Sequence, residues 1–130
     1  MLFFGHRFIE SEKFYHISDI DAITKTPPSS ILYLDFSEQN LDIITYMQEN
    51  RLIFVLNVKN ITELLYAQNL GASYITLSKE LAKSAQSIAE NYLFDAKILV
   101  HIIEENEIEE MAILGIDGVL FPEAVIKINS

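Results

Sequence analysis

The stretch 52–77 reads LIFVLNVKNITELLYAQNLGASYITL and contains the repeating unit from which the fold can be inferred. Its two ends, 52–58 and 74–77, are dense apolar runs that are too short for core helices. Such runs are typical of parallel strands that are covered on both faces. Between them, Asn60 stands where a helix N-cap is expected, and Gly71 stands where a left-handed residue ends a helix. The stretch therefore predicts a strand, a helix and a second strand.

The same pattern recurs on both sides of this unit. Further apolar runs span 31–36, 98–103 and 118–121. Successive runs start roughly 20 to 24 residues apart, which leaves room for one strand, one helix and two short loops. Helix signals fill the gaps, since Ser37 and Ser78 stand at N-cap positions and Gly115 follows the last helical segment. The alternation predicts an α/β fold with a largely parallel sheet.

We expect one domain over residues 1–130, because this length fits a single hydrophobic core. The favoured layout is a flavodoxin-like, three-layer domain with five or six mostly parallel strands and helices on both faces of the sheet. The alternative layout is half of a TIM barrel that completes itself by pairing. In both layouts, ligands bind beyond the carboxyl ends of the strands.

The first 30 residues have a less regular pattern. A strand is expected at 2–4, and 14–17 forms either the second strand of a hairpin or part of a loop. A short helix is expected at 19–23. Five aromatic residues crowd this segment: Phe3, Phe4, Phe8, Phe14 and Tyr15. Because the segment lacks a regular helix that could cover these rings, we predict a homodimer built largely on residues 1–17; alternatively, the rings fold back into the core.

Composition and charge exclude several classes of function. Nine Lys and Arg residues against nineteen Asp and Glu residues give a formal charge of -10, which repels nucleic acid and anionic lipid surfaces. Cys is absent, which excludes thiol catalysis, iron-sulfur clusters and cysteine-ligated zinc. No apolar stretch approaches the ~20 residues of a membrane span, and the amino terminus lacks the features of a signal peptide. We therefore expect a cytoplasmic protein that has no nucleic-acid or membrane partner.

Five polar residues are candidates for a ligand site because they follow predicted strands. His6 and Arg7 follow the first strand, Asp35 and Asn57 close two later strands, and His101 lies in the run 98–103 near its end. Parallel strands end at one edge of a sheet, so these side chains could together bind an anion or a metal. Each also has a structural interpretation, such as a backbone cap for Asp35 or a satisfied core histidine for His101.

No motif in the sequence predicts a cofactor or a metal site. The segment 104–110 holds five carboxylates in seven residues, but glutamates in the first turns of a helix interact favourably with its positive end. An EF-hand loop, a Gly-rich phosphate loop and the H-E-x-x-H and G-x-S-x-G elements do not occur. We predict no cofactor and no bound metal.

The stretch 98–122, ILVHIIEENEIEEMAILGIDGVLFP, contains a Gly-x-Asp-Gly-Val step at 115–119 that leads to a proline. This stretch resembles the last strand-helix-strand unit of glycerophosphodiester phosphodiesterases, which are TIM barrels, and 5–7 (Gly-His-Arg) is similar to the His-Arg that opens that family. The family's Pro-Glu-Asn-Thr motif is absent, and its metal-binding Glu-x-Asp strand reads Tyr-Leu-Asp at 33–35. The resemblance therefore implies a shared strand-helix construction rather than a shared activity.

Two functions from different classes remain open. The leading hypothesis is a non-catalytic domain that acts through self-association or a protein partner, because core and cap signals are abundant and matched catalytic sets are not. The alternative is a domain that binds a small anionic ligand or a phosphoester, with possible hydrolysis. Whether the protein is an enzyme stays open. Polar side chains that converge at one end of the sheet would favour the alternative.

Overall fold

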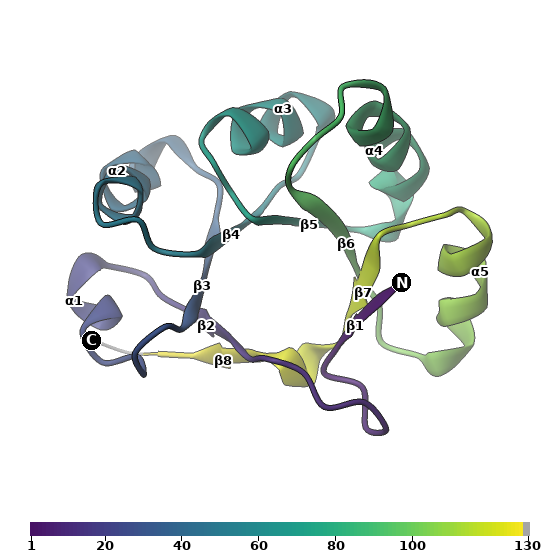
Figure 1. Cartoon of the computed structure of the whole chain (residues 1–130), viewed down its shortest axis with the longest axis horizontal. Helices are drawn as coiled ribbons and strands as arrows, with labels where there is room; N and C mark the ends of the chain where they lie inside the picture. The colour runs from purple at the N-terminus through teal and green to yellow at the C-terminus, as the bar shows by residue number, and fades with distance from the viewer. Residues whose placement is uncertain (129–130) are drawn as a thin grey trace.

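The computed structural model describes residues 1–128, and it consists of an eight-stranded parallel sheet curled into a ring-like half-barrel with helices around it (Figure 1). The strands are β1 (Leu2–Phe4), β2 (Phe14–His16), β3 (Ile31–Asp35), β4 (Phe54–Asn57), β5 (Tyr74–Leu77), β6 (Lys97–His101), β7 (Gly118–Leu120) and β8 (Val125–Lys127). The strand order is β1-β7-β6-β5-β4-β3-β2-β8, and every pairing is parallel.

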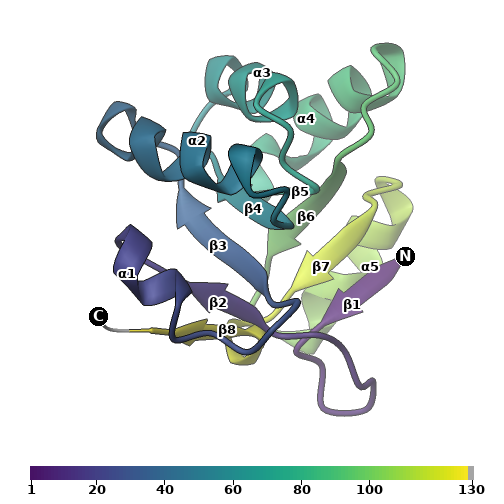
Figure 2. The same cartoon turned by 60° about the vertical axis from the view of Figure 1, so that its left-hand side comes forward.

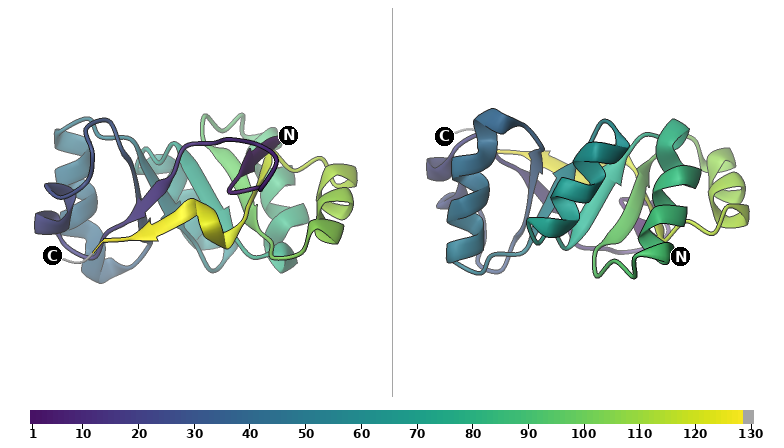
Figure 3. Two further views of the ribbon diagram at one scale, coloured as in Figure 1. Left: turned by 90° about the horizontal axis from the view of Figure 1, so that it is seen from below. Right: turned by 90° about the horizontal axis from the view of Figure 1, so that it is seen from above.

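Within residues 1–128, five α-helices lie outside the curled sheet (Figures 1 and 2). They are α1 (Ile20–Ile23), α2 (Leu41–Glu49), α3 (Ile61–Asn69), α4 (Lys79–Asn91) and α5 (Ile108–Ile113), and the short 3₁₀ turns are η1 (Glu38–Asn40), η2 (Glu105–Glu107) and η3 (Pro122–Ala124). Helices α2 to α5 stand side by side along the outer surface, whereas the side that contains β8 is covered by no described helix (Figure 3). Within residues 1–128, no helix is long and apolar enough to span a membrane.

The predicted fold class is confirmed, and the layout is the alternative half-barrel. The flavodoxin-like arrangement is not adopted, because the helices cover only the outer face while the inner face is filled by the strands' own side chains. In the described part of the chain the sheet also has eight strands, where five or six were expected. Strand β1 coincides with the strand expected at 2–4. The further strands are β2, whose segment was expected to form either a hairpin strand or part of a loop, and β8, which was not expected; each has three residues, which is too short for a pattern of period two to identify it.

Apolar side chains cover both faces of the sheet, which explains the continuous apolar runs. On the outer face, alternate strand residues such as Leu34, Leu56 and Ile75 belong to the large core beneath the helices. The inner core contains Phe4, Phe14, Ile31, Tyr33, Val55, Leu99, Leu120 and Ala124. The rings of Phe4 and Phe14 lie 5.4 and 5.6 Å from that of Tyr74 on β5, so side chains from opposite parts of the sheet meet in the interior.

Local signals set the helix boundaries as predicted. The N-cap Asn60 accepts a hydrogen bond from the Glu63 backbone N–H at 2.9 Å through its side-chain oxygen. Gly71 has φ +92° and Gly115 has φ +75°, the left-handed conformation expected where α3 and α5 end. These two turns return the chain to the start of the next strand.

The amino-terminal segment closes the sheet rather than forming a hairpin. Strand β2 runs parallel to both β3 and β8, and β1 pairs with β7, so the hairpin expectation is wrong. The Phe121 N–H donates to the Phe4 carbonyl at 2.9 Å and continues the pairing of β1 with β7. The two edge strands, β1 and β8, come close where Gly5 lies against Ala124. Gly5 has φ +82°, and a Cβ there would lie 2.7 Å from the Ala124 nitrogen, so only glycine fits this closure.

Most aromatic rings of this segment are covered by the domain itself. Phe4 and Phe14 are buried in the inner core, and Phe3 and Tyr15 pack against the outer core. Phe8 is the exception, with 73% of its surface exposed. The premise that the rings need a second subunit therefore holds only for Phe8.

Candidate functional site

A hollow of about 660 Å³ lies beyond the carboxyl ends of β4, β5 and β6, and we refer to it as the strand-end hollow. It is lined by Tyr33, Asn57, Val58, Lys59, Ser78, Lys79, Glu80, His101, Ile102, Ile103 and Glu107. Its polar side chains come from adjacent strands, because parallel register places the last residues of β3 to β6 side by side.

Asn57 is the centre of a hydrogen-bond network at the floor of this hollow. Its side-chain Nδ2 donates to Asp35 Oδ1 at 3.0 Å, and its Oδ1 accepts from the Thr76 hydroxyl at 2.9 Å. The Nε2 atom of His101 lies 3.1 Å from the same Oδ1 and 3.2 Å from the Tyr33 hydroxyl. Four neighbouring strands thus hold five polar side chains in one connected arrangement.

Burial determines the charge state of two members of the network. Burial lowers the pKa of His101, and the nearby Asp35 carboxylate offsets only part of this shift. Burial likewise raises the pKa of Tyr33 to about 12. At neutral pH the floor of the hollow therefore presents a neutral imidazole and a neutral phenol.

Charged groups form the rim of the strand-end hollow. Lys79 Nζ lies 3.0 Å from Glu107 Oε1, and Glu107 Oε2 accepts hydrogen bonds from the backbone N–H groups of Ile103 and Glu104 at 3.0 and 2.9 Å. These backbone bonds, with Lys79, lower the pKa of Glu107 to about 2. Lys59 forms no ion pair with any residue in 1–128, so its ammonium group can neutralise a ligand's charge.

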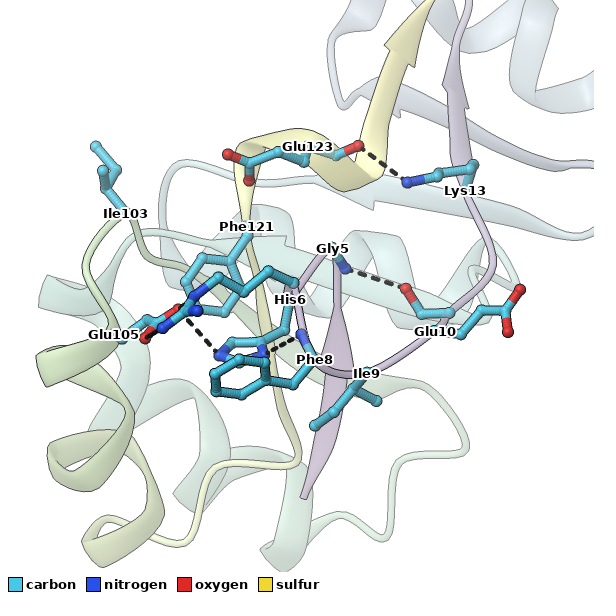
Figure 4. A pocket seen from close by; sticks show the side chains of 12 residues that line it. Gly5, His6, Phe8, Ile9, Glu10, Lys13, Ile103, Glu105, Phe121 and Glu123 are labelled. Carbon is cyan, nitrogen blue, oxygen red and sulfur yellow. Dashed lines mark hydrogen bonds and ion pairs between the residues drawn. The ribbon is translucent and has the colours of Figure 1, made fainter.

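A second hollow of about 690 Å³ lies between the segment that follows β1 and the loop after β6, and we refer to it as the loop hollow (Figure 4). It is lined by Gly5, His6, Arg7, Phe8, Ile9, Glu10, Ser11, Lys13, Ile103, Glu105, Phe121 and Glu123. Ile103 borders both hollows.

The polar groups of the loop hollow pair mainly with one another. Arg7 contacts both carboxylate oxygens of Glu105, at 2.7 and 3.0 Å, and this pairing is the main reason why the pKa of Glu105 is lowered. His6 Nε2 lies 3.3 Å from Glu105, and His6 Nδ1 accepts from the Phe8 N–H at 3.1 Å. The Arg7 guanidinium also lies 4.1 Å from the centre of the Phe8 ring.

The five predicted site residues thus fall into two groups. Asp35, Asn57 and His101 are brought together at the strand-end hollow, whereas His6 and Arg7 lie in the loop hollow. They are separated because β7 lies between β1 and β6 in the sheet, and because Glu105 holds His6 and Arg7.

Tyr33, Lys59 and Thr76 belong to the strand-end hollow or its network and were not among the predicted site residues. Tyr33 lies two positions before Asp35 on β3, so the two share a face of the sheet. Thr76 is the register partner of Asn57 on the neighbouring strand. Strand alternation at the predicted strand ends is the signal that could have found both residues.

Within residues 1–128, no three His, Asp or Glu side chains are grouped so that they could hold a metal ion. No protein-family model matches the sequence, and no curated protein shows significant similarity to it. The function is therefore inferred from the geometry of the two hollows.

Proposed function

We propose that this protein binds a small organic anion in the strand-end hollow. The observation that carries the proposal is the convergence of Asp35, Asn57, Thr76, Tyr33 and His101 from four adjacent strands beneath two lysines. Such a network orders buried polar groups that would lower the stability of the fold if they were unpaired. It also lies at the carboxyl ends of the strands, where parallel α/β folds bind their ligands.

The rim favours a negatively charged ligand. Lys59 has no carboxylate partner among the described residues. Lys79 pairs with Glu107 Oε1, while two backbone N–H groups donate to Glu107 Oε2. The amino end of the thirteen-residue helix α4 opens at the same rim. There, hydrogen bonds from its own backbone N–H and from Ser78 lower the pKa of Glu80, which supports a local preference for negative charge.

Isothermal titration with inorganic phosphate and with ethyl phosphate tests this proposal. We expect binding by the wild type and roughly tenfold weaker binding by Lys59→Met, because one charge-assisted contact is lost. Lys97→Met is the matched control, since Lys97 begins β6 at the end opposite to His101. Absence of binding at millimolar concentration, or equal weakening by both variants, would contradict the proposal.

A second candidate function is self-association through the loop hollow. Its apolar rim consists of Phe8, Ile9 and Ile103, of which Phe8 and Ile103 are 73% and 74% exposed. Exposed apolar groups that lie together favour a protein contact. The contact would involve part of the segment 1–17, as the homodimer prediction requires.

Sedimentation equilibrium of Phe8→Glu against the wild type tests self-association. Phe4 is unsuitable for this test because it is buried in the inner core. Tyr92→Glu is the matched control, since Tyr92 is a similarly exposed ring that caps the far end of α4. We expect a wild-type dimer that only Phe8→Glu dissociates, and a monomeric wild type at high micromolar concentration would contradict this second candidate.

A further inference from the structure

We infer that the ligand of the strand-end hollow carries a hydroxyl group next to its anionic group, and that Nδ1 of His101 accepts a hydrogen bond from this hydroxyl. The inference rests on the proposed function and deepens it by naming the ligand class, a hydroxylated organic anion. It follows from the hydrogen-bonding directions in the network, taken in order from Asp35 to His101.

Asp35 fixes the orientation of the Asn57 amide. A carboxylate only accepts hydrogen bonds, so the Asn57 atom that lies 3.0 Å from Asp35 Oδ1 must be the donating Nδ2. The amide oxygen of Asn57 then faces Thr76 and His101. The reversed amide would place two oxygens against each other at Asp35.

Asn57 in turn fixes the tautomer of His101. Its Oδ1 can only accept, and His101 Nε2 lies 3.1 Å away, so Nε2 carries the proton. In a neutral imidazole with a proton on Nε2, Nδ1 holds a lone pair and is a hydrogen-bond acceptor. The phenol of Tyr33, 3.2 Å from Nε2, also contacts the proton-bearing side of the ring.

The accepting Nδ1 atom belongs to a side chain that lines the strand-end hollow. Among residues 1–128 it has no hydrogen-bond partner, although no fully buried side-chain nitrogen or oxygen in this part of the chain lacks one. Nδ1 is therefore reached by solvent, and His101 lines the strand-end hollow. A ligand that displaces this solvent must offer a donor to Nδ1, since a desolvated acceptor without a partner weakens binding.

The lysines and His101 thus require two different groups on one ligand. The ammonium group of Lys59, together with that of Lys79 beside Glu107, attracts an anion, while His101 accepts from a donor. An organic anion without a hydroxyl would satisfy the lysines and leave Nδ1 unpaired. Sites built to bond a ligand hydroxyl reject the analogue that lacks it.

Titration with ethyl phosphate and hydroxyethyl phosphate tests the inference, because the two probes differ by one hydroxyl. In the wild type we expect hydroxyethyl phosphate to bind on the order of tenfold more tightly. His101→Phe should bind the two probes equally, and the control His6→Phe, in the loop hollow, should keep the wild-type ratio.

Nitrogen NMR of the wild-type imidazole rings gives a readout that needs no variant. The His101 Nδ1 resonance should shift with hydroxyethyl phosphate and stay in place with ethyl phosphate. Equal affinities for the two probes, or a hydroxyl preference without a shift at Nδ1, would overturn the inference while leaving the proposed function standing. Failure of both probes to bind would overturn the two together.

Discussion

The two hollows differ in what holds their polar groups. In the strand-end hollow, Asp35, Asn57, Thr76 and His101 lie on neighbouring strands, so the backbone ladder fixes their spacing. In the loop hollow, the polar groups come from two loops and converge on the single carboxylate of Glu105. The strand-end hollow therefore keeps one hydrogen-bond acceptor, Nδ1 of His101, unpaired among the described residues and available to a ligand. In the loop hollow, by contrast, the polar groups pair mainly with one another, and apolar side chains are exposed.

The largest expected effect concerns the closure beneath the loop hollow. Gly5→Ala should lower the free energy of unfolding by about 3 kcal/mol, because the left-handed φ penalises a Cβ and the Ala124 backbone leaves no room for it. Gly71→Ala is the control, since it shares the positive φ but has open space around it, and it should lose only about 1 kcal/mol. Urea unfolding of both variants measures the difference, and equal losses would show that Gly5 is not needed for the closure.

The next effect should appear at the strand-end hollow. Asn57→Ala removes the donor to Asp35 and the acceptor of Thr76, so we expect a loss of about 2 kcal/mol in the free energy of unfolding. Asn69→Ala, which removes only an exposed bond to the Leu65 carbonyl, should change it by less than about 0.5 kcal/mol. If the two variants were equally stable, the network would not be the ordered unit described above.

A smaller effect should depend on pH. Because the pKa of His101 is lowered in the folded state, the unfolded chain binds a proton first as the pH falls. The stability linked to His101 is therefore present above the ordinary imidazole pKa of about 6.5 and is lost below it. His101→Gln should show a flatter dependence of unfolding free energy between about pH 8 and 5.5 than the wild type; parallel curves would contradict the burial of this ring.

The smallest effect is expected in the loop hollow. Arg7→Met breaks the ion pair with Glu105, but Arg7 is 66% exposed and solvent screens the pair. The free energy of unfolding should stay within measurement error of the wild type. A clear loss that disappears at high salt would show that this surface pair stabilises the fold.

The sequence predicts the repeating part of the molecule well, because periodicity and cap residues are local signals. Asn60, Gly71 and Gly115 mark their helix ends directly. The curvature of the sheet is not a local feature, since it brings together residues far apart in the chain, such as Phe4 and Phe14 with Tyr74. The sequence alone therefore could not distinguish an open sheet from a curled one.

The sequence predicted only part of the candidate site, because only part of the site depends on local signals. Asp35, Asn57 and His101 each end a strand, so parallel pairing alone brings them to one edge of the sheet. His6 follows a strand as well, but its place depends on β1 being an edge strand beyond β7. The strand order, and the carboxylate of Glu105 that holds His6, could not be read from residue spacing.

The most direct test of the central claim is a map of backbone amide NMR shifts during titration with inorganic phosphate. The binding site proposed here predicts shifts at Lys59, Lys79 and His101, around the strand-end hollow, and none at Arg7 or Phe8 in the loop hollow. Shifts confined to the loop hollow, or no shifts at all, would contradict the assignment of the strand-end hollow as the binding site.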